Sequence, residues 1–197
     1  SAKFEENLLD ATNEFALYVE DAAELAGLPE DELTAMRAAA EADEKSGWKI
    51  TLHMPSYLPV MQYADNRGLR EQVYRAYVTR ASEFGKAELD NTPLIGSILK
   101  LRREAAELLG FRSYAEVSLA AKMADTPAEV LKFLDELGAR ARPYAEKDYA
   151  ELKAFARDEL GMSDLQAWDN TYVSEKLSVA RYSFSDQEVK QYFPEPR

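Results

Sequence analysis

The chain has 197 residues, of which 46% are apolar and 30% are charged, and its formal net charge is −12. This length and composition allow a buried core without disulfides or a structural metal, and they exclude disordered and low-complexity proteins. Nucleic acid is not expected as a partner, because an acidic protein repels a phosphate backbone. Cysteine is absent and His53 is the single histidine, which excludes thiolate chemistry and any site in this chain that needs two imidazoles.

The sequence carries no signal for membrane insertion or secretion. No uncharged apolar run approaches the roughly 18 residues that a membrane helix needs, so we expect no membrane partner. The first residues lack the basic start and the apolar stretch of a signal peptide, which favours a cytoplasmic protein. The sequence begins with Ser1 instead of Met, and we expect it to be part of a longer protein.

The first predicted element is a small β structure. The run Phe15 to Val19 has β-forming residues, and in the run Trp48 to Met54 apolar and polar side chains alternate. Alternation with a period of two is typical of a half-buried strand. We therefore predict that residues 15–19 pair with residues 48–54, with a helical insertion between them. On the polar face of the second run lies His53, which we interpret as a surface or hydrogen-bonded histidine and not as a metal ligand.

The rest of the chain carries helical signals. Apolar side chains at helical spacing from Leu69 to Phe84 predict one helix. A glycine followed by an apolar residue is typical of a helix C-terminus, and this pattern occurs at Gly27, Gly110 and Gly161. Sequences that fit a capping box predict helix starts at Ser113, Thr126 and Ser163.

A long apolar period runs from Val130 past Pro143 to Phe155. It predicts either one helix bent at Pro143 or two helices that meet there. The predicted fold class is therefore mainly α, a multi-helix array with one small two-stranded β element.

Motifs for catalysis are missing from the sequence. The glycines are too widely spaced for a phosphate loop, and no serine lies in a Gly-x-Ser-x-Gly turn. The most function-like run has arginines interleaved with tyrosines: Arg67, Arg70, Tyr74, Arg75, Tyr77 and Arg80. Our preferred interpretation of this run is structural, with buried tyrosine rings and with arginines paired to local acids.

Several sequence blocks, in a fixed order, carry a family resemblance. They include Met54-Pro55-Ser56-Tyr57-Leu58-Pro59, Asp65-Asn66, Tyr74-Arg75-Ala76-Tyr77, Leu108-Leu109-Gly110-Phe111 and Trp168-Asp169-Asn170-Thr171-Tyr172-Val173-Ser174-Glu175-Lys176. In order and spacing these blocks resemble the thimet oligopeptidase family of zinc metallopeptidases, and most of all its bacterial oligopeptidase A branch. The last block is similar to the family's Trp-Asp-x-x-Tyr-Tyr-x-Glu-Lys block, although Val173 stands in place of the second tyrosine.

The resemblance implies an endopeptidase that cleaves short peptides in a channel between two mostly helical halves. It also implies a zinc ion held by a His-Glu-x-x-His helix and a later glutamate. With only His53 available, the resemblance places no catalytic and no metal-binding residue in this chain, and the zinc helix is expected downstream of Arg197. Residues 1–197 are then expected to form a single helical fragment of scaffold and channel wall, inactive by itself and without bound zinc.

Four residues are candidates for contact with a peptide substrate: Trp168, Asp169, Tyr172 and Lys176. A polar and aromatic block of this kind is unusual in a helical scaffold. The alternative is that Trp168 and Tyr172 are core residues and that Asp169 caps the helix that follows.

A second hypothesis for the whole chain is a standalone, non-catalytic helical interaction module derived from the peptidase fold. The two hypotheses differ in the surface that they predict. A fragment is expected to expose apolar surface that packed on the missing parts and to self-associate through it, whereas a module is expected to cover that surface.

Overall fold

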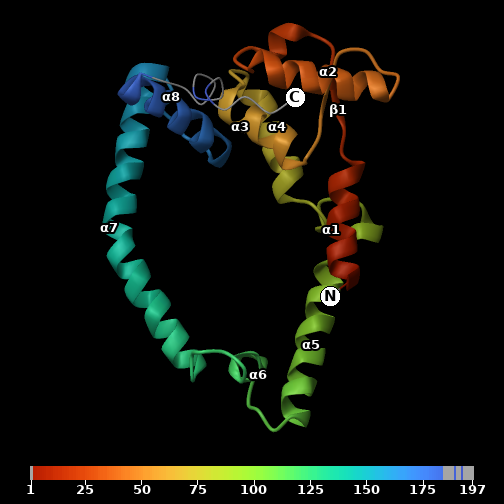
Figure 1. The fold of residues 1–197 in the computed structure, drawn as a ribbon, viewed down its shortest axis with the longest axis vertical. Coiled ribbons are helices and arrows are strands. Elements are labelled where there is room, and N and C mark those ends of the chain that lie inside the picture. Colours follow the sequence, from red (N-terminus) through yellow and green to blue (C-terminus); the bar gives the residue numbers. More distant parts are fainter. Residues whose placement is uncertain (1, 184–188, 190–191, 193–197) are drawn as a thin grey trace. The chain divides into compact units, whose positions relative to one another are not determined.

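The structure is a computed structural model that describes residues 2–183, 189 and 192, and it is mainly helical (Figure 1). The α-helices are α1 (Ala2–Glu14), α2 (Glu30–Ala42), α3 (Met54–Tyr63), α4 (Arg67–Val78), α5 (Thr92–Leu108), α6 (Tyr114–Leu119), α7 (Pro127–Leu160) and α8 (Asn170–Tyr182). Three short 3-10 helices are η1 (Ala22–Leu25), η2 (Ala87–Leu89) and η3 (Ala167–Asp169). The strands β1 (Leu17–Val19) and β2 (Trp48–Ile50) pair antiparallel. The predicted fold class is confirmed.

Both strands are shorter than predicted, and β2 ends at Ile50. The backbone N–H of Thr51 donates to the Ser56 hydroxyl at 2.9 Å and is therefore lost to the sheet. Helix α3 begins a few residues later with Pro55 in its first turn, where the ring is pre-organised for a helix. The predicted extension of the strand was therefore wrong. His53 is exposed, as expected, but it lies at the N-terminal cap of α3 and not on a strand.

Helix α4 ends at Val78, so the prediction of one helix through Phe84 was wrong. Arg80 folds back and donates from Nε to the Tyr77 carbonyl at 2.8 Å, which satisfies one of the free carbonyls at the helix end. Ala81 then adopts a φ of 50°, a left-handed conformation that a right-handed helix cannot contain. The end of α4 is thus set by contacts that the apolar spacing does not reveal.

Several predicted helix boundaries are confirmed. Gly110 and Gly161 follow α5 and α7 with φ values of 79° and 65°. The Ser113 hydroxyl accepts from the Glu116 backbone at 3.3 Å at the start of α6. Thr126 precedes α7 and accepts from the Glu129 backbone at 3.2 Å. At these four positions the local signal is sufficient to place the helix end.

Helix α7 is one continuous helix through Pro143, which decides between the two predicted alternatives. The predicted helix start at Ser163 was wrong, since the chain remains irregular there. The next helical segment is η3, whose capping box is formed by Gln166 and Asp169. The chain therefore begins its next helical turn at the capping box of Gln166 and Asp169, and not at the predicted capping sequence that starts with Ser163.

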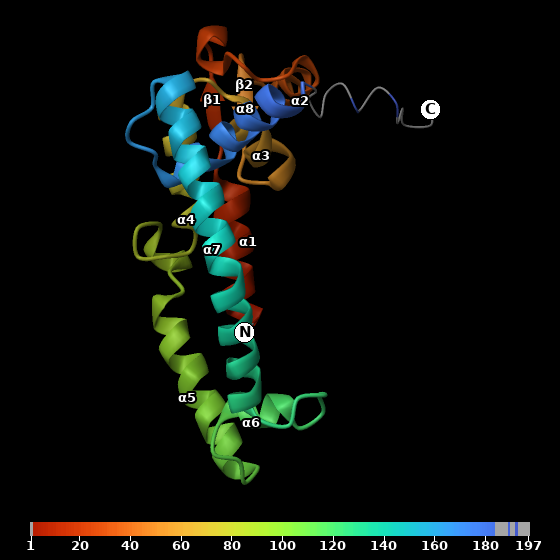
Figure 2. The same ribbon diagram turned by 90° about the vertical axis from the view of Figure 1, so that its left-hand side faces the viewer.

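The chain divides into two compact units, residues 1–7 with 81–150 and residues 8–80 with 151–197. The second unit holds the hydrophobic core, whose buried members are Val19, Leu25, Leu28, Met36, Trp48, Ile50, Leu52, Val60, Ala64, Leu69 and Val73. In this unit α2 packs against β2, and α3 packs against both α4 and α8 (Figure 2). None of the helices within the described stretch has both the length and the apolar character needed to cross a bilayer.

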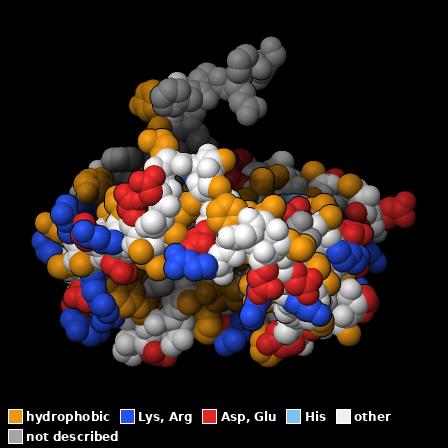
Figure 3. Space-filling model, turned by 90° about the horizontal axis from the view of Figure 1, so that it is seen from below, with side chains coloured by type: hydrophobic (Ala, Val, Ile, Leu, Met, Phe, Trp, Pro, Cys, Tyr) orange, Lys and Arg blue, Asp and Glu red, His pale blue; other side chains and the backbone are white. Residues whose placement is uncertain are grey.

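Apolar side chains also lie at the surface. Figure 3 shows them between charged groups on one face of the molecule. Large apolar side chains that are more than half exposed include Phe84, Leu108, Leu109, Met123, Leu131, Phe133 and Tyr144. All of these residues belong to the first unit, which therefore leaves much of its apolar surface in contact with water.

Candidate functional site

The polar centre of the second unit is the carboxylate of Asp169, which is completely buried. Arg67 Nη2 lies 2.7 Å from its Oδ2, and Arg70 Nη2 lies 2.8 Å from its Oδ1. Arg70 is itself 1% exposed, whereas the Arg67 side chain is 44% exposed. The backbone N–H of Gln166 adds a third donor at 3.0 Å to Oδ2. Both carboxylate oxygens are thus occupied by the protein itself.

Local sequence explains how these groups meet. Asn66 caps α4 by accepting from the Leu69 backbone at 3.2 Å, which fixes the first turn. Arg67 and Arg70 are three residues apart, so they project from one face of that turn. The capping box of η3 holds Asp169 at the end of its own short turn. The first turn of α4 and the start of α8 are therefore joined through one carboxylate.

Asp169 has opposing influences on its pKa. Burial alone would raise the pKa of this carboxyl, but hydrogen bonds from Arg67 and Arg70 lower it, and the net shift is downward. The same contact raises the pKa of Arg67, chiefly through its hydrogen bond to Asp169. The buried carboxylate is therefore ionised at neutral pH.

A second carboxylate, Asp65, lies between α3 and α4 and binds two of the predicted residues. The Tyr172 hydroxyl donates to Asp65 Oδ1 at 2.8 Å, and Lys176 Nζ lies 3.4 Å from the same oxygen. The guanidinium carbon of Arg70 lies 4.0 Å from the centroid of the Tyr172 ring. Burial, followed by the bond to Asp65, raises the pKa of Tyr172 to about 12, so its phenol remains a hydrogen-bond donor. We call Asp65, Arg67, Arg70, Asp169, Tyr172 and Lys176 the α4–α8 network.

Gly27 packs closely against the loop that carries Asp65. It has a φ of 91°, and a Cβ built there would lie 2.2 Å from the Tyr63 carbonyl oxygen and 2.9 Å from Asp65 Cγ. The Asp65 backbone N–H donates to the Ala26 carbonyl at 2.8 Å. Only glycine allows this close approach of two chain segments. The sequence predicted Gly27 as a helix end, and the structure adds this packing role.

Trp168 packs against α4 instead of facing open solvent. Its ring lies 5.0 Å from the Arg75 guanidinium and 6.1 Å from the Tyr74 ring centroid. Its indole N–H is buried and has no hydrogen-bond partner among the residues that the structure describes. Arg75 also pairs with Glu71 at 2.8 Å. Trp168 is nevertheless only half-buried and is not a member of the hydrophobic core.

The structure brings together all four predicted site residues with the arginines of α4. The interpretation that those arginines pair with local acids holds for Arg75 but was wrong for Arg67 and Arg70, whose partner lies 102 and 99 residues away. Asp169 does not cap α8 with its side chain, because it accepts from the preceding Gln166 instead. Sequence reasoning left Asp65 out of the site, although the Asp65-Asn66 block was visible.

The network has a buried part and an open part. Asp169 and Arg70 are buried and paired with each other, so they hold the two helices together. Arg70 donates through Nη1 and Nη2, while its buried Nε has no partner among the residues that the structure describes. The side chains of Asp65 and Lys176 are 48% and 37% exposed. Asp65 can accept a hydrogen bond from a peptide N–H, and Lys176 can donate one to a peptide carbonyl or carboxylate. This arrangement is suited to binding and positioning.

The described residues contain no group of three or more His, Cys, Asp and Glu side chains close enough to hold a metal ion. His53 lies exposed at the start of α3, and the sequence has no second histidine that could join it as a ligand. These residues do not fit a zinc site of two imidazoles and a carboxylate.

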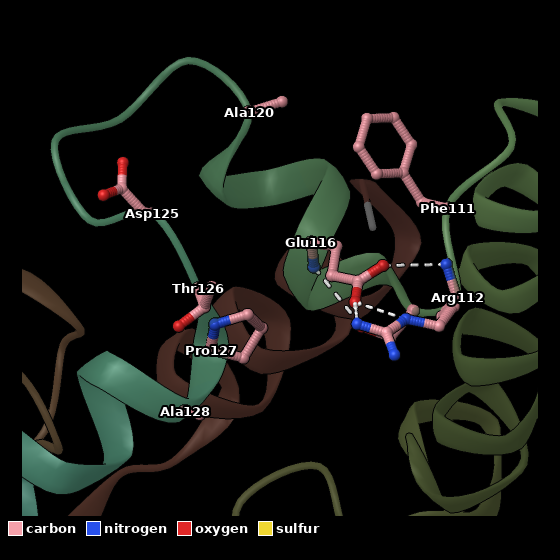
Figure 4. A pocket seen from close by; sticks show the side chains of 9 residues that line it. Phe111, Arg112, Glu116, Ala120, Asp125, Thr126, Pro127 and Ala128 are labelled. Atoms are coloured by element: carbon pink, nitrogen blue, oxygen red, sulfur yellow. Dashed lines mark hydrogen bonds and ion pairs between the residues drawn. The ribbon is translucent and has the colours of Figure 1, made fainter.

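The first unit contains an open pocket of about 820 Å³ between α6 and the start of α7 (Figure 4). Glu116 points toward Arg112 and accepts from its backbone N–H at 2.8 Å and from its Nε at 3.0 Å. The backbone hydrogen bond from Arg112 is the main cause of the lowered pKa of Glu116. Thr126 lines the same pocket and caps α7. Glu116 and Thr126 are therefore engaged at the starts of α6 and α7, and no predicted site residue lines this pocket.

Comparison with known proteins is consistent with the sequence blocks. Residues 60–197 match the model of Peptidase family M3. The chain is 52% identical over 195 residues to Oligopeptidase A of Salmonella typhimurium, which covers 98% of this chain and 29% of that protein. It is 48% identical over 199 residues to Oligopeptidase A of Haemophilus influenzae, covering 100% of this chain and 29% of that protein. Dipeptidyl carboxypeptidase of Escherichia coli is 31% identical over 194 residues, covering 98% of this chain and 28% of that protein. The chain thus spans less than a third of the length of these relatives, and it belongs to peptidase family M3.

Proposed function

We propose that this chain forms part of the scaffold and channel wall of a zinc-dependent metalloendopeptidase that hydrolyses short peptides. The observation that carries the proposal is the continuous match to proteins named Oligopeptidase A at 48–52% identity over nearly the whole chain. The match covers 29% of those proteins, so residues outside this stretch are proposed to supply the zinc site. The isolated chain is proposed to be inactive and to bind no zinc.

The α4–α8 network fits a structural role for its buried residues and a peptide-binding role for its exposed ones. Its buried carboxylate, Asp169, has both oxygens engaged and is not free to act as a general base. Its open members, Asp65 and Lys176, are the groups that a passing peptide would meet. Short peptides are the proposed substrates of the longer protein, and zinc would polarise their scissile carbonyl there. The cytoplasm is the proposed location.

The rival hypothesis of a standalone interaction module predicts covered apolar side chains. Phe84, Leu108 and Met123 are between 77% and 101% exposed. Exposure on this scale supports the scaffold hypothesis, because an independent soluble module rarely presents so much apolar surface. The isolated chain is accordingly proposed to self-associate at high concentration.

The central experiment compares the 197-residue chain with the product of the complete open reading frame. Both are purified and assayed with a short fluorogenic peptide, with and without a zinc chelator. We expect hydrolysis only by the longer product, lost on chelation and restored by zinc. Zinc-dependent hydrolysis by the isolated chain, or none by the longer product, would refute the proposal.

Substrate contact by the network is tested by Lys176→Met and Tyr172→Phe in the longer product, with Lys100→Met as an exposed control. Loss of a charge-assisted hydrogen bond to substrate costs roughly 1.5 kcal/mol, so kcat/KM should fall about tenfold for Lys176→Met. The Lys100 variant should match the wild type. Unchanged kcat/KM with normal folding would remove Tyr172 and Lys176 from the substrate site.

A further inference from the structure

The middle of α7 is left uncovered by the part of the chain that the structure describes. Every residue from 131 to 150 is exposed. Leu134 and Leu137 are each 53% exposed, and Tyr144 is 73% exposed. With Ala141 they are spaced three, four and three residues apart, so they share one face of the helix. We call Leu134, Leu137, Ala141 and Tyr144 the α7 stripe.

This part of α7 is poorly suited to stand alone. Pro143 lies inside it and Gly138 lies beside the stripe. A proline inside a helix costs about 3 kcal/mol and a glycine costs about 1 kcal/mol relative to alanine. Most helical stability in proteins comes from packing of an apolar face and not from propensity. A helix with these residues and a bare apolar stripe therefore requires a partner.

The charges beside the stripe describe that partner. One flank carries the cations Arg140 and Lys147, and no ion pair of either is found in the part of the chain that the structure describes. The other flank carries Leu131, Gly138 and Ala145, so neither flank has an acid, and the nearest carboxylate in line with the stripe is Asp148, four residues after Tyr144. By analogy with paired helices, a partner should present an apolar stripe bordered by carboxylates. A second copy fits poorly, because antiparallel pairing of the stripe places Arg140 against its own copy.

We infer that the α7 stripe is covered by an apolar, acid-bordered helix from the part of the longer protein that lies outside residues 1–197. The inference rests on the proposed function. The most similar relatives named above contain this stretch as 29% of their length, so further polypeptide is available on the same chain. Covalent attachment gives such a segment an effective concentration in the millimolar range. The inference thus names both the face of this unit that docks and the chemistry of what docks there.

The chain contains no cysteine, which allows a direct test. Leu137→Cys is introduced into the isolated chain and into the product of the complete reading frame, and maleimide labelling of its tryptic peptide is followed by mass spectrometry. The control is Arg142→Cys, since Arg142 lies outside the stripe and its flanks and its side chain is 79% exposed. We expect Leu137→Cys to label at least tenfold more slowly in the longer product than in the dilute isolated chain, with Arg142→Cys equal in both.

The outcomes separate this inference from the proposed function. Equal labelling of Leu137→Cys in both proteins overturns the inference, even when the longer product is an active peptidase. Protection that disappears on dilution of the longer product indicates a second copy and also overturns it. Protection that is independent of dilution, and that Arg140→Glu weakens several-fold, supports it. Should Leu137→Cys fail to fold, Leu134→Cys serves as the second reporter.

Discussion

At the residue level, the carboxylate of Asp169 in the second unit forms ion pairs with two arginines, Arg67 and Arg70. Asp169 and Arg70 are both buried, whereas Arg67 reaches solvent. A buried ion pair is weak evidence for net stability, because desolvation offsets the attraction. Removing one partner is different, since it leaves the other charge buried and unpaired. Arg70 is the residue that would be left in this state.

We expect Asp169→Asn to destabilise the fold by about 3 kcal/mol, since it leaves the Arg70 guanidinium buried without a counter-charge. Urea unfolding of the isolated chain, followed by tryptophan fluorescence, measures this loss, and Trp168 next to Asp169 reports on the network. The matched control is Asp158→Asn, which breaks the exposed pair with Arg157. No measurable change is expected for the control. Equal effects of the two variants would contradict the assigned role of Asp169.

The lowered pKa of Asp169 predicts how the same loss depends on pH. A group whose pKa is lower in the folded state stabilises that state above its unfolded pKa, and this stabilisation disappears as the pH falls through the folded value. The stability difference between the wild type and Asp169→Asn should therefore be constant from pH 5 to 7 and shrink below about pH 4. Urea titrations at each pH measure it. A difference that persists unchanged at pH 2 would show that the carboxylate charge is not responsible.

At the level of elements, most helix ends with a local signal were predictable, although the capping sequence at Ser163 failed. Gly110 and Ser113 act through neighbours within a few residues, so their sequence context is sufficient. The pairing of Arg67 with Asp169 spans 102 residues, and local sequence cannot show which acid an arginine meets. Strand β2 failed for a different and local reason, because Ser56, five residues further along the chain, competes for the Thr51 N–H that the alternating pattern assigns to the sheet.

The close packing of Gly27 on the loop between α3 and α4 predicts the effect of a substitution there. Gly27→Ala should destabilise the second unit by about 2 kcal/mol or more, because its Cβ would lie 2.2 Å from the Tyr63 carbonyl oxygen and φ is positive. It should also loosen Asp65 and so lower the affinity of the longer product for peptide. The control is Gly96→Ala in α5, where a Cβ meets nothing within 4 Å and alanine favours the helix by up to about 1 kcal/mol. Thermal unfolding by circular dichroism measures both. Equal stability of the Gly27 variant and the wild type would contradict the packing role.

At the level of the whole molecule, the two units differ in how much they bury. The second unit contains the hydrophobic core. In the described part of the first unit, the buried residues are Asn7, Ala81, Leu89, Asn91 and Ala106. Two of these are asparagines that bond to each other at 3.0 Å, so little apolar surface is removed from water. Such a unit cannot offset the conformational entropy of its own helices.

In the isolated chain, the rates of amide hydrogen exchange should therefore differ between the two units. Amides of α4 and β2 should exchange at least about 100-fold more slowly than those of residues 92–108 and 131–150, because local opening is easiest where few apolar contacts are lost. In the product of the complete reading frame, protection should rise over residues 131–150, where the α7 stripe lies, and should change little in α4. Mass spectrometry of peptic fragments measures both proteins at the same pH and temperature. Equal protection of α4 and α7 in the isolated chain would mean that the first unit is stable without a cover, and the exposed face of α7 would then need no partner.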